Sequence, residues 1–299
     1  MPGVRGPRRL PLARRPLTVA WERGLGPRVP GDVVLAPTPL APPRRRTPQV
    51  VVVHDAVPWT HPETLTPRGV AWHRRAVARA GREADLVVVP TRAVAEELQR
   101  HVALPRLAVV GEGVSADLAL PPDADARAAR LGLPERYVLA VATLEPRKGL
   151  AELVRALPQA TDLPLLVAGQ AGWGEVDLGA PTDRVRLLGR VADADLAVLL
   201  RRATALVVPS RAEGFGLPLL EGMAVGTPVL TSDAPALVEV AGGAALAVPL
   251  DDLVDGLRAV LGDEGLRARL RTAGPERAAA FTWDRAAADV WRAVDALPG

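Results

Sequence analysis

Residues 205–232 read ALVVPSRAEGFGLPLLEGMAVGTPVLTS. The run ALVVP is typical of a short buried strand, PLLEGMAVG of a helix, and PVLTS of the next strand. Glycines and a proline separate the first strand from the helix, as expected at a sharp turn. A strand, a turn, a helix and a second strand in this order predict a βαβ unit with parallel strands.

The same alternation continues on both sides of this unit. Upstream, strands are predicted at 49–55, 84–90 and 107–114 and helices at 68–84 and 92–102, and a second series begins at Tyr137 after a linker over 116–135. Two successive doubly wound units place a ligand cleft between them, at the carboxyl ends of their strands. We therefore expect an α/β protein with two Rossmann-like domains, 1–116 and 117–283, and a C-terminal helix within 284–299 that packs back on the first domain.

The first 46 residues differ in composition from the rest. They are rich in proline and arginine, with weak strand candidates only at 17–20 and 33–35. We expect poor order or an atypical structure there. The arginines alternate with prolines and predict no amphipathic helix, which argues against a protein whose main function is to bind a membrane or nucleic-acid surface.

Composition excludes several classes of site. The 299 residues contain no cysteine, so a disulfide framework, a thiolate metal site and a cysteine nucleophile are excluded. The net charge of +3 does not imply nucleic-acid binding. No apolar run approaches the roughly 18 residues of a membrane-spanning helix, and the basic start lacks the apolar core of a signal peptide. The expected location is the cytoplasm, with peripheral membrane contact as a further option.

A pair of cations marks another strand end. Residues 143–150 read TLEPRKGL, and Lys148 is the single lysine among 37 basic residues. Arg147 and Lys148 fall at the start of a predicted helix, where cations oppose the helix dipole at a cost of about 0.3 to 1 kcal/mol. A phosphate would relieve this conflict, because helix amides, guanidinium and ammonium would all face one anion. The alternative is a solvated basic loop.

Two glutamates flank the glycine turn of the quoted stretch. Gly214 and Gly216 let backbone amides approach a ligand, and Pro218 suits the first helical position, which would put Glu221 in the first turn. There Glu221 can bridge the two hydroxyls of a ribose, while Glu213 faces the cleft and can accept from sugar hydroxyls. Two glutamates at this spacing are, taken alone, more often surface acids; their place at a strand-to-helix turn favours a site.

Asp193 and Asp195 form an Asp-x-Asp pattern that some transferases use to hold a metal. In this chain they open a predicted helix, so Asp193 is interpreted as its N-cap residue. We expect no metal and no cofactor besides the substrates.

Several motifs in a fixed order resemble glycosyltransferase family four, the retaining GT-B group, over residues 50–295. They are VVVVHD (50–55), ADLVVVPTRAVAEEL (84–98), VVGEGV (109–114), ATLEPRKG (142–149), AGQAGWG (168–174), VRLLGRVADADLAVLL (185–200), SRAEGFGLPLLEGMAVGTPVLTSD (210–233) and FTWDRAA (281–287). TLEPRKG with AGQAGWG is similar to bacterial mannosyltransferase-like members. The resemblance implies a GT-B fold and transfer of a mannosyl or glucosyl group from an NDP-sugar, GDP-mannose or a UDP-hexose, to a hydroxyl of a sugar or lipid-linked acceptor.

The resemblance also implies residue roles. Arg147 and Lys148 would hold the donor diphosphate, Glu221 the ribose diol, and Glu213 the hydroxyls of the transferred sugar. Backbone amides of Gly214, Phe215, Gly216 and Leu217 would help to hold the sugar and phosphates of the donor. The turn at Gly189, Arg190 and Val191 would read the edge of the nucleotide base. His54 matches a histidine near the reacting sugar, although a single histidine at a strand end is often only a polar turn residue.

Two features depart from the family pattern. The family usually begins with a strand and a glycine-rich loop, which the start of this chain does not show, so the N-terminal domain is expected to be incomplete. Glu112 stands where the family usually has asparagine, which adds a negative charge near an expected anion site. Besides an enzyme of cell-surface polysaccharide or glycolipid synthesis, a catalytically inactive nucleotide-sugar-binding or scaffold protein therefore stays open.

Overall fold

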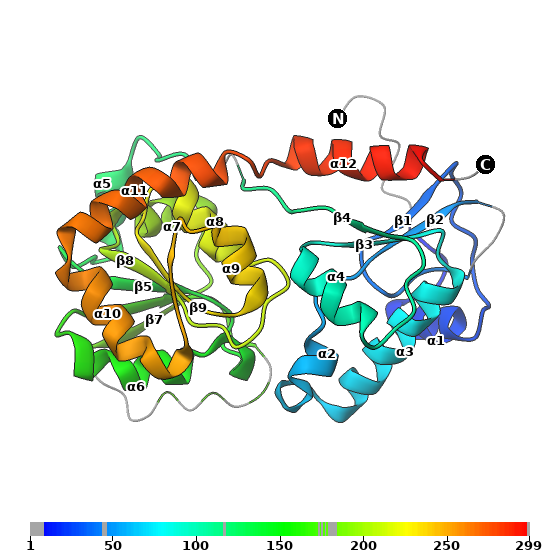
Figure 1. Ribbon diagram of the computed structural model, residues 1–299, viewed down its shortest axis with the longest axis horizontal. Coiled ribbons are helices and arrows are strands. Elements are labelled where there is room, and N and C mark those ends of the chain that lie inside the picture. Colours follow the sequence, from blue (N-terminus) through cyan, green and yellow to red (C-terminus); the bar gives the residue numbers. More distant parts are fainter. Residues whose placement is uncertain are drawn as a thin grey trace.

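The structure is a computed structural model that describes residues 9–43, 47–115, 118–172, 174, 176, 178 and 184–297. Two lobes lie side by side, one with a four-stranded sheet and one with a six-stranded sheet (Figure 1). All strand pairs within both sheets are parallel. The expected α/β class is confirmed. Trp173, in the motif AGQAGWG, lies outside the described residues.

The N-terminal sheet contains β1 (Val34–Ala36), β2 (Gln49–Val52), β3 (Leu86–Val89) and β4 (Leu107–Val109), in that order. The connections contain α2 (Val57–Thr60), the 3-10 turn η1 (Pro62–Thr64), α3 (Pro67–Glu83) and α4 (Arg92–Gln99). Thr66 and Thr91 begin α3 and α4, each accepting a backbone N–H three residues on, at 3.1 and 3.2 Å. The described strands of this sheet lie side by side in their sequence order, without a reversal. The doubly wound order that was expected of both domains is therefore found only in the second.

The two faces of the N-terminal sheet are covered by different helices. Val51 and Val87 pack in one cluster with residues of α3 and α4. Val50 and Val88 point to the opposite face, because successive side chains of a strand alternate. There they meet α12 (Trp283–Asp295), which crosses from the C-terminal lobe and lies along the N-terminal one (Figure 1).

Two predictions for the start of the chain are wrong: the weak strand at 17–20 and the absence of an amphipathic helix. The helix α1 (Arg14–Glu22) occupies the expected strand at 17–20, and it is amphipathic, with Trp21 buried and Arg14 and Arg15 exposed. Arg79 of α3 donates a hydrogen bond to the carbonyl of Trp21. Burying a large aromatic side chain outweighs the weak local preference of the segment, which is a tertiary effect that the sequence pattern does not carry.

The C-terminal sheet has the doubly wound order β10-β9-β8-β5-β6-β7. Its strands are β5 (Val138–Val141), β6 (Leu165–Ala168), β7 (Val185–Gly189), β8 (Ala205–Val208), β9 (Val229–Ser232) and β10 (Leu246–Val248). Its helices and 3-10 turns are α5 (Ala124–Arg130), η3 (Pro146–Lys148), α6 (Leu150–Ala160), α7 (Asp193–Arg202), α8 (Leu217–Ala224), α9 (Pro235–Ala241), η4 (Leu250–Asp252), α10 (Leu253–Gly262) and α11 (Glu264–Ala278). The order reverses between β5 and β8, which is where such sheets bind ligands.

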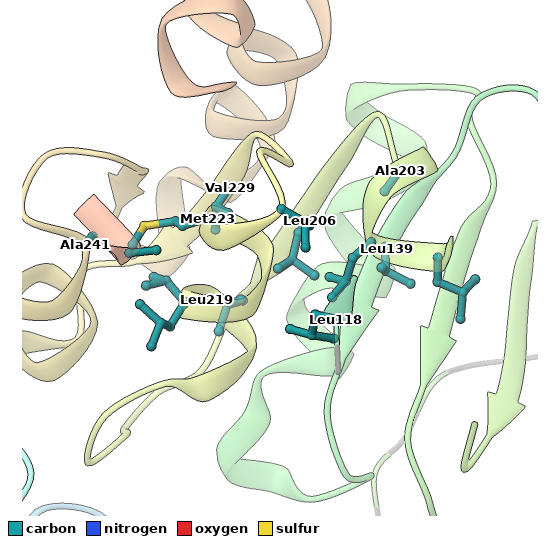
Figure 2. Close-up of a cluster of buried hydrophobic side chains, with 14 of the residues drawn as sticks. Leu118, Leu139, Ala203, Leu206, Leu219, Met223, Val229 and Ala241 are labelled. Carbon is teal, nitrogen blue, oxygen red and sulfur yellow. The ribbon is translucent and has the colours of Figure 1, made fainter. Parts of the chain in front are cut away.

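An aliphatic cluster fixes α8 against this reversal point. Leu139 of β5 and Leu206 of β8 belong to one cluster with Leu219 and Met223 of α8, and all four are fully buried (Figure 2). Each side chain of this size contributes about 1.5 to 3 kcal/mol when it is buried. The cluster therefore positions the turn between β8 and α8 at the carboxyl end of the sheet. In the part of the chain that the structure describes, no helix is both long and apolar enough to cross a membrane.

The chain passes between the lobes twice, and the two crossing segments touch. The backbone N–H of Val114 donates to the carbonyl of Phe281 at 3.2 Å, and Val114 pairs with Thr282 in a parallel bridge. A Cβ atom on Gly113 would lie 2.2 Å from the backbone nitrogen of Trp283. Only glycine fits this approach without moving backbone.

A carboxylate adds a further contact between the lobes. Glu239 of α9 accepts from the backbone N–H groups of Arg92 and Ala93, at 3.0 and 2.9 Å. These are the first residues of α4, whose N-terminal amides have no partner within the helix. One lobe thus caps a helix of the other.

We predict that Gly113→Ala destabilises the chain by at least about 2 kcal/mol, because its methyl group would meet backbone atoms of the second crossing segment. Gly111→Ala is the matched control: its Cβ would have side-chain neighbours at 3.4 and 3.5 Å, an ordinary contact distance. Thermal unfolding of both variants checks this. Equal midpoints would contradict the tight crossing.

Candidate active site

The loop after β5 carries the cation pair. Arg147 and Lys148 lie in η3, and α6 begins only at Leu150, after Gly149 in the left-handed conformation (φ +66°). A Cβ on Gly149 would fall 1.8 Å from the carbonyl oxygen of Pro209, so this loop packs directly on the loop that follows β8. The prediction that the two cations lie at the start of the helix is corrected. They lie in the short 3-10 turn that precedes it.

Glu213 joins both cations. Its carboxylate accepts from Lys148 Nζ at 2.6 Å and from Arg147 Nη1 at 3.0 Å. The three side chains are only 9 to 16% exposed. The sequence predicted an anion beside these two cations. The carboxylate of Glu213 supplies part of that negative charge. Lys148 has three N–H donors and arginine five, so both retain donors for another anion.

Burial and charge act against each other on Glu213. Burial of its carboxyl group disfavours ionisation, but Lys148 and Arg147 outweigh this and lower the pKa of Glu213 below its usual value. Glu213 therefore stays a carboxylate, and the cluster is an ion network instead of a set of neutral hydrogen bonds.

The sequence did not single out three members of this network. Ser210 donates to Glu213 Oε1 at 2.8 Å. Glu145 lies 3.6 Å from Arg147 and accepts from Thr143 at 3.0 Å. All lie inside the quoted motifs, so a search for every polar residue at the ends of β5 and β8 would have found them.

The glycine turn before α8 contacts the N-terminal lobe. A Cβ on Gly214 would lie 1.7 Å from the carbonyl oxygen of His54, and the hydroxyl of Thr91 donates to the carbonyl of Gly214 at 3.0 Å. The side chain of Phe215 is buried and stacks edge-to-face on Phe281 with ring centroids 5.6 Å apart. Of the predicted donor-binding residues in this turn, Phe215 can therefore offer a ligand only its backbone.

The expected position of Glu221 in its helix is corrected by one residue. Gly216, at φ +96°, is the N-cap residue and Leu217 the first residue of α8, so Pro218 is second and Glu221 fifth. Glu221 is partly buried. Burial, with the nearby negative charge of Asp193, raises the pKa of Glu221 to about 7. This interaction also places the first residue of α7 near α8.

The predicted base-reading segment follows the end of β7. Gly189 has φ +66° and open space where a Cβ would lie, and its carbonyl accepts from Gly169 at 2.9 Å. Arg190 is exposed, while Val191 packs against the core cluster around α8. Since α7 starts two residues later, this segment and Glu221 lie on the same side of the C-terminal lobe.

The prediction that Asp193 is the N-cap residue of its helix is wrong. Ala192 is the N-cap residue of α7 and Asp193 is its first residue, without a side-chain cap. Asp195 accepts from Arg127 and Arg130 at 2.8 and 2.7 Å. Within the described ranges, no group of three or more histidine, aspartate or glutamate side chains could hold a metal ion.

His54 belongs to the N-terminal lobe, just beyond the carboxyl end of β2. Its Nδ1 is 3.3 Å from Glu112 Oε1, and its Nε2 is 2.9 Å from the carbonyl oxygen of Pro37. The Glu112 contact raises the pKa of His54 above its usual value, against an opposing effect of burial. The sequence anticipated neither partner.

Fold and site together define a class: a two-lobed protein of GT-B type, with an ion network where its lobes meet. Residues 123–277 match the family Glycosyl transferases group 1, and residues 2–118 match Glycosyltransferase Family 4. The chain belongs to the glycosyl transferases group 1, and its resemblance to family four is confirmed.

Individual relatives match parts of the chain. The O-antigen chain mannosyltransferase B of Escherichia coli is 37% identical over 50% of this chain and 42% of its own length. A D-inositol 3-phosphate glycosyltransferase of Streptomyces avermitilis is 34% identical over 71% of this chain and 52% of its own length. The chain thus spans about half the length of the curated relatives it matches.

Solved structures share the fold. A sucrose-phosphate synthase from Thermosynechococcus elongatus superposes with a TM-score of 0.74 at 24% identity, over 89% of this chain and 74% of its own. The Anabaena protein HepE, solved with UDP and glucose, also gives 0.74, at 23% identity, over 89% and 78%. These likenesses confirm the GT-B architecture.

We predict that the stability of the chain depends on pH through Glu221. Its carboxyl group has a pKa of about 7 when folded, against 4.5 when unfolded, so the folded state keeps a proton that the unfolded state loses. This group therefore lowers the free energy of unfolding as pH rises through this window.

Glu221→Gln removes this dependence. Its gain over the parent should be larger at pH 8 than at pH 5, by on the order of 2 kcal/mol. Thermal unfolding at the two pH values measures this, with the exposed Glu135→Gln as control. A Glu221→Gln effect that is the same at both pH values would show that the carboxyl group is not held protonated.

Proposed function

We propose that this chain is a retaining glycosyltransferase that moves a hexosyl group, mannosyl or glucosyl, from an NDP-sugar to a hydroxyl acceptor. The observation that carries the proposal is the network of Lys148, Arg147 and Glu213, because it gathers spare N–H donors at the carboxyl ends of β5 and β8. This is the ligand-binding edge of a doubly wound sheet.

In the proposed complex, the donor diphosphate lies on Arg147 and Lys148. Both side chains are mostly withdrawn from water, which strengthens their attraction for phosphate oxygens. Glu213 holds the two cations apart and oriented, and its free lone pairs accept from sugar hydroxyls. Backbone N–H groups of the turn at Gly214 to Leu217 complete this half of the donor site.

The nucleoside half of the donor lies further along the same edge. Glu221 takes the ribose diol and the segment at Gly189, Arg190 and Val191 borders the base. The open space at Gly189 supports this placement. A carboxylate accepts from a diol better than a neutral acid does, so nucleotide binding favours the ionised form of Glu221.

Catalysis in this scheme is mainly electrostatic. As the bond from the anomeric carbon to the diphosphate breaks, negative charge grows on the leaving group, and Arg147 and Lys148 stabilise it. No carboxylate pair is assigned as acid and nucleophile, because Glu213 is held by two cations and Glu221 serves the ribose. These cations take the part that a metal ion plays in other transferases, and neither metal nor cofactor is assigned.

The relatives suggest a substrate range. Two matched relatives are named as an O-antigen chain mannosyltransferase and a phosphatidyl-myo-inositol mannosyltransferase, and HepE was solved with UDP-glucose. GDP-mannose or a UDP-hexose as donor, and a glycan or lipid-linked acceptor, fit these names. We place the reaction in cell-surface polysaccharide or glycolipid synthesis, in the cytoplasm and peripheral to the membrane.

We predict that Lys148→Ala lowers the rate of sugar transfer by on the order of a hundredfold or more, because it removes one charge-assisted contact to the leaving group. The matched control is Arg155→Ala, which removes an exposed cation from α6 and should leave the rate unchanged. Transfer of labelled mannose or glucose measures both. If the parent binds GDP or UDP but transfers no sugar, the chain is a catalytically inactive nucleotide-sugar-binding protein and the proposed function is wrong.

The single lysine allows a direct test of binding. Reductive methylation can modify only Lys148 and the chain's α-amino group, since no other primary amine exists in the sequence. GDP or UDP should slow methylation of Lys148 several-fold, because the ammonium becomes occupied by phosphate. Guanosine and uridine, which lack phosphate, are the controls. Equal rates with nucleotide and nucleoside would remove Lys148 from the donor site.

A further inference from the structure

His54 is held at both of its ring nitrogens. The carbonyl oxygen of Pro37, 2.9 Å from Nε2, can only accept, so Nε2 must carry a proton. Glu112 Oε1, 3.3 Å from Nδ1, accepts as well when it is ionised. A ring that faces two acceptors is satisfied when both nitrogens are protonated, which makes it an imidazolium.

The charges around the ring favour the same state. Asp55 adds negative charge next to His54, and Arg147 from the other lobe interacts with Asp55. On the side of α12, His54 and Glu112 border an apolar groove of 370 Å³. None of the other described residues that line this groove can titrate.

Glu112 also has neighbours of both signs. Arg277, Arg285 and Asp289 line a small pocket together with it. Arg277 already donates to two backbone carbonyls of α9 and Arg285 to the carbonyl of Ala280. Among the described residues, the ion pair of Glu112 is with His54, whose Nδ1 lies 3.3 Å from Glu112 Oε1.

His54 adjoins the proposed donor site through its backbone, whose carbonyl contacts Gly214, the residue after Glu213. The side chain is half exposed, so a substrate can reach it. A cation on this residue would add positive charge on the N-terminal side of the turn that follows Glu213.

We propose that His54 acts as a fixed cation towards the donor and its leaving diphosphate, not as a base for the acceptor, and that Glu112 is the residue that positions it in this state. The proposal rests on the proposed function for its substrate, but the state of the ring can be measured without one. It gives a role to Glu112, which departs from the family pattern.

The two roles predict opposite pH profiles. A general base works when it is deprotonated, so the rate would rise with pH through the pKa of His54. A fixed cation works when it is protonated, so the rate falls as pH rises through that pKa. Glu112→Gln should move the fall to lower pH, because the neutral amide no longer stabilises the imidazolium, and Glu112→Asp should restore part of the difference.

The deciding experiment is an NMR titration of the imidazole groups of the unliganded full chain, which has four histidines. His54→Gln assigns the signal. We expect the midpoint of His54 to lie above the ordinary value of 6.5, and Glu112→Gln to shift it to lower pH. Glu97→Gln is the matched control: it breaks the other histidine–glutamate pair, with His101, and should leave the midpoint of His54 unchanged.

An unchanged midpoint in Glu112→Gln, or a parent midpoint at or below 6.5, would overturn the proposal, as would a rate at saturating donor that rises with pH through the midpoint. The signals of the other three histidines show whether each variant is folded. Nucleotide protection of Lys148 tests the donor site separately. A chain that fails that test but has a protonated His54 would disprove the proposed function and not the charge state of the ring.

Discussion

The ion network of Lys148, Arg147 and Glu213 is the constraint on which the site depends. It ties the loop after β5 to the loop after β8, two strands that lie next to each other although their loops are about sixty residues apart in sequence. Removing one member of a buried ion network costs about 3 to 5 kcal/mol, because the remaining charge is left without a partner. The network therefore keeps both loops in one arrangement before any ligand arrives, and Gly149 allows them to touch. A site that is already ordered loses less entropy on binding.

The second constraint is the contact between the lobes. The donor half of the site belongs to one sheet and His54 to the other, so their distance depends on the crossing segments at Gly113 and on the contacts of Gly214. Glu239 adds a carboxylate at the N-terminus of α4, where it meets the positive end of the helix dipole. The contacts named here are between backbone and polar groups. Polar contacts between domains leave room for relative motion.

Much of this arrangement could be predicted from the sequence, for reasons that particular residues show. Apolar runs such as ALVVP alternate with helical segments, and both periodicities are local, so the strands from residue 49 onward and the longer helices were predicted, whereas the short helices α2 and α9 were not. The pairing of Lys148 with Glu213 was not, because it joins residues 65 positions apart and only the strand order brings them together. The helix at Arg14–Glu22 was missed for a similar reason, since burial of Trp21 is a tertiary effect. The start of α8 was misplaced because Gly216 can adopt a left-handed conformation that ends the turn one residue early.

The two walls of the cleft carry titratable groups with opposite requirements. Under the proposed roles, Glu221 must lose its proton to accept from the ribose, whereas His54 must keep both of its protons to face the diphosphate. Burial raises the pKa of Glu221 to about 7, and Glu112 raises the pKa of His54 above its ordinary value. If the pKa of Glu221 were raised and that of His54 were not, Glu221 would be fully ionised only at a pH where His54 is already neutral. Because Glu112 raises the pKa of His54, the pH range over which both active forms are present becomes wider. A carboxylate of the N-terminal lobe thus helps to match the charge state of His54 to that of Glu221 in the C-terminal lobe.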